Sequence, residues 1–162
     1  MEAAELGVEL TGDNAIVWKD DRFYLLDQRY LPQEADFLPL DDVAAVHDAI
    51  RDMVVRGAPA IGITAAFGVV VAVRNRYQAE GESWKQSIEE DLELLAQSRP
   101  TAINLFWAIE RMRGLIEQLG DGDPVPTLLA EAKQIHEDDI NANRKIGDLA
   151  AALIETPTSV IT

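Results

Sequence analysis

The pattern of apolar and polar positions predicts a β-hairpin near the N-terminus. Residues 16–18 and 23–26 are β-branched, aromatic or leucine runs, and the four polar residues between them are typical of a hairpin turn. Pro32 and Pro39 punctuate the polar connection that follows. We therefore expect this hairpin to be the only clear β element before the C-terminal end of the sequence.

A series of helices is predicted after the hairpin. Asp41 and Asp42 open the first, because acidic residues suit a helix N-terminus. Its expected apolar stripe comprises Val43, Val46, Ile50, Met53 and Val54. The second helix, residues 60–76, is apolar nearly all round, which is typical of a helix at the centre of a core. Its charge-free stretch, 57–73, is marginal for a bilayer span of about 20 residues and contains three glycines, so we interpret it as the core helix of a soluble protein.

Three further helices are expected. One restarts at residues 81–83, and another opens at Pro100 and ends before 120–124. Leucine, isoleucine and methionine recur along the latter at spacings of three and four: Leu105, Ile109, Met112, Ile116 and Leu119.

The last predicted helix, residues 127–154, is the longest. Its stripe is Leu128, Ala132, Ile135, Asp139, Asn143, Ile146, Ala150 and Leu153. The two polar members either face solvent or turn towards a second domain or partner, and the pattern leaves both open. Residues 159–162 read as the first strand of an α/β unit.

These elements predict a mainly α fold with an N-terminal β-hairpin, ending in the first strand of a truncated Rossmann-like α/β domain. We expect residues 1–125 to form the hairpin and helical domain. Residues 126–162 would then be a connecting helix and that strand, in a sequence representing part of a longer protein.

Composition narrows the classes of function. A net charge of -15 repels phosphate backbones and anionic lipid, so neither nucleic acid nor membrane is an expected partner. The acidic N-terminus lacks the pattern of a secretory signal, which favours a cytoplasmic location. There is no cysteine, and no metal or glycine-rich nucleotide motif stands out, so no metal or cofactor is expected.

Two arginines precede proline-opened helices, in Arg56-Gly57-Ala58-Pro59 and Ser98-Arg99-Pro100-Thr101. A helix N-terminus presents unpaired N–H groups and a partial positive charge, and a guanidinium adds forked donors. Gly57 would let an anion approach the backbone. The two segments therefore indicate a phosphate or carboxylate site. The alternative is that each arginine pairs with one of the many surface carboxylates.

Other candidate residues carry weaker signals. His47 and His136 have no acidic or histidine neighbour at metal-ligand spacing that rises above chance, and both are interpreted as structural. Residues 89–91 are expected to form a solvated acidic face, and residues 137–139 also, unless another domain covers them. The apolar cluster 105–107 is interpreted as core, although Trp107 could also wall a small pocket.

Three segments together resemble methylthioribose-1-phosphate isomerases. They are residues 55–62 (VRGAPAIG) followed by 65–68 (AAFG), residues 98–108 (SRPTAINLFWA), and residues 137–147 (EDDINANRKIG). The resemblance extends over essentially the whole sequence. This family is related to the regulatory subunits of the eukaryotic initiation-factor exchange complex and to ribose-1,5-bisphosphate isomerases. The Asn-Leu-Phe-Trp motif favours the methylthioribose branch over these relatives.

The resemblance implies a helical N-terminal domain, a Rossmann-like C-terminal domain and a homodimer in the full-length protein. It implies that Arg56, Gly57, Ala58 and Arg99 contact a sugar phosphate. The family's catalytic cysteine and aspartate would lie beyond Thr162, so residues 1–162 alone are expected to be inactive. The expected activity is the interconversion of 5-methylthioribose 1-phosphate and 5-methylthioribulose 1-phosphate in methionine salvage. A non-catalytic binding protein that recognises a sugar phosphate or nucleotide, or an assembly surface, are the alternatives.

Overall fold

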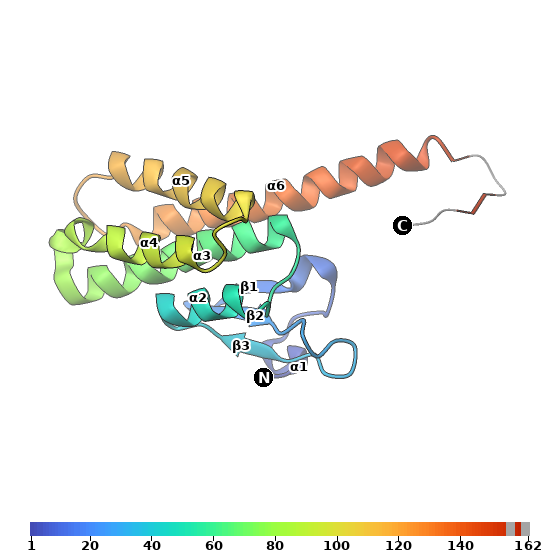
Figure 1. Cartoon of the computed structure of the whole chain (residues 1–162), viewed down its shortest axis with the longest axis horizontal. Coiled ribbons are helices and arrows are strands. Elements are labelled where there is room, and N and C mark those ends of the chain that lie inside the picture. The colour runs from blue at the N-terminus through green and yellow to red at the C-terminus, as the bar shows by residue number, and fades with distance from the viewer. Residues whose placement is uncertain (155–157, 160–162) are drawn as a thin grey trace.

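A computed structural model describes residues 1–154 and 158–159, and it places a small antiparallel sheet beside a group of helices (Figure 1). In chain order the elements are α1 (Ala3–Leu6), the 3-10 helix η1 (Gly12–Asn14), β1 (Ile16–Lys19), β2 (Arg22–Leu26), β3 (Phe37–Pro39), α2 (Val43–Arg51), α3 (Ala58–Glu80), the 3-10 helix η2 (Gly81–Gln86), α4 (Ile88–Gln97), α5 (Ile103–Gln118) and α6 (Val125–Ala151). The mainly α class and the N-terminal position of the β structure are confirmed.

The predicted hairpin is present, with a tighter turn than its sequence suggests. β1 and β2 pair antiparallel, with Trp18 opposite Phe23 and Lys19 opposite Arg22. Only Asp20 and Asp21 remain for the turn, and both have positive φ, 48° and 57°. A two-residue hairpin turn of this hand matches the twist of the strands, and aspartate tolerates the left-handed region better than most residues.

A third strand, β3, was not expected, and the prediction of a lone hairpin is wrong. Phe37 to Pro39 pair antiparallel with Leu26 to Tyr24, which gives the sheet order β1-β2-β3. Three residues are too few to show an alternating pattern. The proline that discouraged a strand assignment is tolerated because it lies on an edge strand, where one side of the backbone needs no partner.

The central strand β2 contributes to two clusters of apolar side chains. Phe23 and Leu25 belong to the main core, whereas Tyr24 and Leu26 pack on the opposite face in a small cluster that includes Leu6 of α1. Successive side chains of a strand point to opposite faces of the sheet. Covering β2 on both sides therefore requires α1 on one face and the helices on the other.

Helix α3 lies at the centre of the main core, as its all-round apolar surface predicts. Every residue from Ile61 to Val73 is buried. This helix has the length and hydropathy of a possible membrane span, but 72% of its most apolar window is buried within the protein. The ring of Phe67 stacks on Phe23 at 5.4 Å and on Trp18 at 6.2 Å between centroids, which joins the helix to the hairpin.

Several predicted helix boundaries differ from the structure, among them the end of α2 and the start of α5. α2 begins as expected, with the Asp42 carboxylate accepting a hydrogen bond from the Ala45 N–H at 2.7 Å. It ends at Arg51, however, so Met53 lies outside the predicted stripe, 42% exposed and with a φ of 60°. α5 begins at Ile103, because Pro100 occupies a turn closed by a hydrogen bond from the Ala102 N–H to the Arg99 carbonyl.

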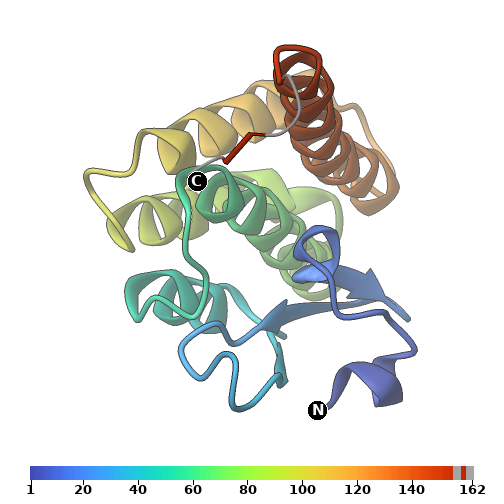
Figure 2. The same ribbon diagram turned by 90° about the vertical axis from the view of Figure 1, so that its right-hand side faces the viewer.

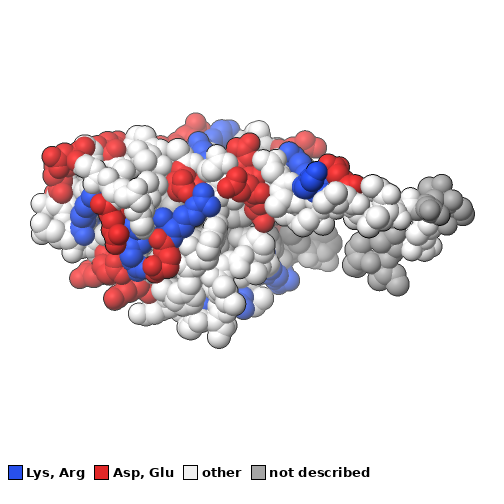
Figure 3. All heavy atoms as spheres, turned by 90° about the horizontal axis from the view of Figure 1, so that it is seen from above, with Lys and Arg blue, Asp and Glu red and all other residues white. Residues whose placement is uncertain are grey.

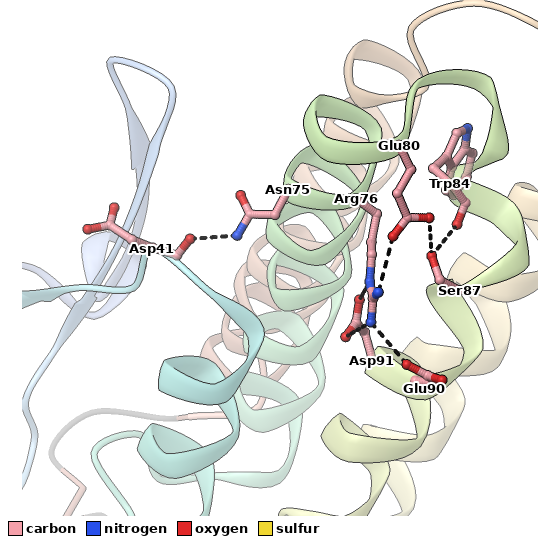
Figure 4. A network of polar contacts seen from close by, with 8 residues as sticks. All are labelled: Asp41, Asn75, Arg76, Glu80, Trp84, Ser87, Glu90 and Asp91. Carbon is pink, nitrogen blue, oxygen red and sulfur yellow. Dashed lines mark hydrogen bonds and ion pairs between the residues drawn. The ribbon is translucent and has the colours of Figure 1, made fainter.

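The acidic run in the first turn of α4, residues 89–91, is not simply a solvated face, because Asp91 is only 8% exposed. Arg76 of α3 donates to both Asp91 oxygens, at 2.7 and 3.0 Å, and also to Glu80 and Glu90 (Figure 4). Ser87 bonds the other Glu80 oxygen. This network fastens α3 to α4, and none of its residues lines either cavity described below.

The second half of α6 extends past the rest of the molecule (Figure 1). Leu128, Ala132 and Ile135 are buried against the core as predicted, but the stripe does not continue inside, because Ile146 is 64% and Leu153 84% exposed. The predicted strand 159–162 lies largely outside the described residues. The Rossmann-like ending and the domain boundary near residue 125 therefore stay predictions.

Two glycines of α3, Gly62 and Gly68, allow neighbouring helices to approach closely. Replacement of Gly62 tests this packing. A Cβ on Gly62 would lie 2.7 Å from the Asn104 carbonyl oxygen, a backbone atom that cannot turn aside. We expect Gly62→Ala to lower the free energy of unfolding by about 1–3 kcal/mol, as overpacking does.

The matched control is Gly114→Ala in α5, where an added Cβ meets nothing within 4 Å. It should raise stability by about 0.5–1 kcal/mol, since glycine weakens a helix interior. Urea unfolding measures both variants, and equal effects would contradict the close-approach argument.

Candidate functional site

The first turns of α3 are flanked by two cavities. Both are lined by Ile63 of α3 and Asp139 of α6, so they adjoin one another. α3 and α5 begin at the same end of the helical group (Figure 1), and Figure 2 views the molecule from that end, with the blue hairpin below the start of α3 and the red α6 above it. The candidate site therefore forms where the hairpin, α3, α5 and α6 meet.

The first of these, which we call the apolar cavity, has a volume of about 400 Å³ and lies between α3, α5 and α6. Its hydrocarbon walls are Pro59, Ile63, Ile103, Trp107 and Ile135. Its polar lining groups are Asn104, Asp138 and Asp139. No arginine or lysine is among its lining residues in the described part of the chain, so its charge is negative.

The second, which we call the polar cavity, has a volume of about 280 Å³ and lies between η1, β1, α3 and α6. Its hydrogen-bonding side chains are Asp13, Gln28, Arg56, His136, Asp139 and Asn143. Here a cation and several acceptors surround one space, so this cavity is suited to a polar ligand.

Arg56, Gly57 and Ala58 lead directly into α3 beside the polar cavity. The Arg56 N–H donates to the Gln28 side-chain oxygen at 2.9 Å, and the Gln28 N–H donates to the Val54 carbonyl, so Gln28 holds the connection between α2 and α3. Gly57 has a φ of 92°, which only glycine adopts without strain. No side chain caps the start of α3. Its first N–H groups are therefore left for an anion.

Arg99 occupies the turn before α5 and is half-buried. The start of α5, like that of α3, has no side-chain cap. Gly62 brings the two helices together near Asn104. The structure thus places both predicted helix starts in one region. Arg99 itself, however, is not among the described residues that line either cavity.

Neither predicted arginine is engaged by a carboxylate. Within the described residues, the Arg56 and Arg99 side chains form no hydrogen bond and no ion pair. The eight other arginines all donate from their guanidinium groups: Arg22, Arg29, Arg51, Arg74, Arg76, Arg111, Arg113 and Arg144. Figure 3 shows basic side chains lying among acidic ones on one face. The pairing expected as the alternative therefore does not occur at the two helix starts.

A separate ion pair satisfies Asp27, a buried carboxylate that the charge of Arg56 influences. Asp27 is 3% exposed and accepts from Arg29 at 2.9 and 2.6 Å, one bond to each oxygen. The Arg29 hydrogen bonds hold the pKa of Asp27 below its usual value, and the nearby charge of Arg56 acts in the same direction. Because Arg29 already occupies both oxygens, the Arg56 guanidinium stays available.

The two histidines differ in their surroundings. His47 lies beside Asp48 on α2, 3.0 Å from its carboxylate, and lines neither cavity within the described chain. His136 lines the polar cavity and meets the edge of Phe67 at 6.4 Å between centroids. Among the described residues, no group of three or more histidines and carboxylates could hold a metal ion.

Of the lining residues, Gln28 was not singled out from the sequence, whereas Trp107, Asp139 and Asn143 were. Gln28 follows β2 directly, and nothing local indicates that it reaches Arg56. In the predicted core cluster, Leu105 is buried but Trp107 is 51% exposed and walls the apolar cavity, which confirms the second interpretation of that residue. Asp139 and Asn143 both line the polar cavity. Whether another domain covers them stays a prediction.

His136 gives the stability a pH dependence. Burial lowers the pKa of His136 from the ordinary value of 6.5, despite the opposing charges of Asp139 and Asp13. The unfolded chain therefore binds a proton at a pH where the folded chain does not. Stability should fall as the pH drops below about 6.5, and no such loss should occur above it.

The measurement is urea unfolding of the wild type and His136→Gln at about pH 7.5 and about pH 5.5. The wild type should lose more stability than the variant on acidification. Equal losses would show that His136 titrates alike in the folded and unfolded states.

Comparisons with known proteins identify the relatives of this chain. The profile of the initiation factor 2 subunit family matches residues 54–162. A methylthioribose-1-phosphate isomerase from Thioalkalivibrio sulfidiphilus is 53% identical over 91% of the chain, and one from Methylococcus capsulatus is 49% identical over the same share. The chain spans 42% of the length of each of these relatives.

Two solved structures share the fold. The 5-methylthioribose 1-phosphate isomerase from Pyrococcus horikoshii OT3 has a TM-score of 0.79 and 34% identity, and the match covers 86% of this chain and 40% of that one. Subunit delta of the translation initiation factor eIF-2B from A. fulgidus has a TM-score of 0.80 and 35% identity, covering 88% and 42%. The chain therefore belongs to the initiation factor 2 subunit family, and methylthioribose-1-phosphate isomerases are among its relatives.

Proposed function

We propose that this chain supplies the phosphate-binding part of an isomerase that interconverts 5-methylthioribose 1-phosphate and 5-methylthioribulose 1-phosphate in methionine salvage. The observation that carries the proposal is the state of two arginines. The chain has a net charge of -15, and yet, among the arginines of the described residues, only Arg56 and Arg99 donate no hydrogen bond from their guanidinium groups. Both stand before helix starts that have no side-chain cap.

The anion in this proposal is the 1-phosphate of the sugar. Arg56, the backbone at Gly57 and Ala58, and Arg99 would bind it through charged hydrogen bonds and helix N–H groups. Gly57 leaves the approach open, since no atom lies within 4 Å of the Cβ position it lacks. Both helix starts contribute partial positive charge without the desolvation cost of a further lysine or arginine.

Holding the phosphate serves the chemistry at the carbon end. The phosphate sits on the anomeric oxygen, so ring opening needs acid assistance before a proton or hydride moves between C1 and C2. Binding energy from the phosphate orients the sugar for that step. The acid–base groups would come from the part of the complete protein outside this chain, which itself contains no cysteine. No metal or organic cofactor is part of the proposal.

The complete protein is proposed to be a cytoplasmic homodimer. A related non-catalytic role has one specific observation in its favour, namely the likeness to eIF-2B subunit delta, with a TM-score of 0.80. In that case the same anion site would bind a sugar phosphate or nucleotide without turnover. Assaying the complete protein with methylthioribose 1-phosphate separates the two, because only the isomerase forms methylthioribulose 1-phosphate.

Replacing Arg99 tests the phosphate site. In the complete protein, Arg99→Ala should weaken substrate binding by about 1.5–3 kcal/mol, the range for losing a hydrogen bond to a charged group. Calorimetric titration measures the change. Arg51→Ala is the control, because Arg51 is exposed and paired with Asp48 and Asp52 on the surface. An affinity equal to wild type would remove Arg99 from the site.

A second prediction concerns the activity of residues 1–162 alone. Purified residues 1–162 should show no detectable isomerase turnover, since binding and acid–base chemistry are assigned to different parts of the protein. A coupled assay for the ketose product measures this. Turnover by these residues alone would contradict the assignment.

A further inference from the structure

The apolar cavity has large hydrophobic side chains at its rim that the fold does not bury. Ile103 is 81% exposed and Trp107 is 51% exposed, and both line this space together with the buried Ile63 and Ile135. Exposed apolar groups that converge on a cavity are more often a binding feature than those scattered singly on a surface. The cavity therefore requires an explanation that core packing does not supply.

Trp107, the aromatic residue that lines this cavity, is held in place by Arg111. The guanidinium carbon of Arg111 lies 5.4 Å from the centroid of the Trp107 ring. Arg111 is in turn fixed to α6, because its Nε donates to Glu131 at 2.5 Å and a terminal nitrogen lies 3.9 Å from Asp138. The ring orientation is thus set before any ligand arrives, which lowers the entropy cost of binding.

The charged residues that line the cavity are both carboxylates, Asp138 and Asp139. Arg111 lies 3.9 Å from Asp138 but does not line the cavity, and its Nε is engaged by Glu131. Two carboxylates repel a further anion and leave an uncharged group unaffected. The charge pattern therefore favours a neutral occupant.

The cavity adjoins the proposed phosphate site. Pro59 follows Ala58 in the first turn of α3, and Ile103 is the first residue of α5 after the Arg99 turn. A ligand whose phosphate rests on these helix starts would direct its remaining atoms along α3 and α5. A single small molecule can therefore engage both features.

We propose that the apolar cavity is the specificity pocket for the C5 substituent of the sugar 1-phosphate, selecting a neutral thioether and excluding a second phosphate. This inference rests on the proposed function and adds the residues that distinguish one pentose 1-phosphate from another. Sulfur in a thioether makes favourable contacts with aromatic rings, and Trp107 supplies such a ring. Asp138 and Asp139 exclude a second phosphate by charge repulsion.

The first test removes the aromatic wall in the complete protein. Trp107→Ala should lower kcat/KM for 5-methylthioribose 1-phosphate about tenfold relative to ribose 1-phosphate, which lacks the thioether. Phe106→Ala is the matched control, because Phe106 is the adjacent residue, is 38% exposed and does not line the cavity. It should leave the ratio of the two values within about twofold of wild type. An equal ratio in Trp107→Ala and wild type would overturn the inference.

The second test addresses the charge and does not depend on the aromatic residue. The double variant Asp138→Asn with Asp139→Asn should bind ribose 1,5-bisphosphate about tenfold more tightly than wild type, measured as competitive inhibition. Glu137→Gln removes one neighbouring negative charge on α6 that does not line the cavity, and it should change that inhibition less than about twofold. Equal inhibition of the double variant and wild type would overturn the exclusion.

The experiments distinguish an error in the proposed function from an error in the specificity pocket. If wild-type protein does not turn over methylthioribose 1-phosphate, the proposed function and the specificity pocket are both wrong. If it does so and Arg99→Ala weakens binding while the Trp107 and aspartate variants keep wild-type ratios, only the pocket is wrong.

Discussion

The burial of α3 is the constraint on which the rest of the structure depends. A helix with thirteen consecutive buried residues, from Ile61 to Val73, needs neighbours on every side. The hairpin supplies one side through Phe23 and Trp18, and the other helices supply the rest. Gly62 allows α5 to approach, and Gly68 allows α2 and α4 to approach. Because α3 is enclosed from Ile61 to Val73, its N-terminal end becomes the place where its unpaired N–H groups reach ligand-sized space.

Electrostatics makes that end distinctive. In a strongly acidic chain most arginines are bound to carboxylates or carbonyls, as the cluster around Arg76 illustrates. Arg29 satisfies Asp27, the buried carboxylate closest in sequence to Gln28. Arg56 and Arg99 are thereby left with free donors. Leaving a guanidinium unpaired forgoes little stability at the surface, since exposed ion pairs contribute about 0–1 kcal/mol.

The two cavities divide the site by polarity. The polar cavity holds Arg56 and several hydrogen-bonding groups, and the apolar cavity holds Trp107 and a negative rim. A molecule with a phosphate at one end and an uncharged apolar group at the other matches this division. Asp139 lines both spaces, so it stands where the two requirements meet.

The features that could be predicted from the sequence are those with local causes. Alternating and helical periodicities identified the hairpin and the helices, Asp42 marked the start of α2, and the two arginines were identified because they precede helix starts. The assignment of Arg99 to the anion site stays a prediction, because Arg99 stands before α5 yet lines neither cavity in the described chain.

Features that depend on distant partners could not be predicted in this way. β3 exists because β2 offers it an edge, Asp91 is buried because Arg76 reaches it, and Gln28 matters because it holds the backbone before α3. Likewise the apolar stripe of α6 is buried at Ile135 and exposed at Ile146, although the repeat along the chain is the same. Periodicity specifies which residues share a face, whereas burial depends on which other elements lie against that face, and only tertiary packing settles that.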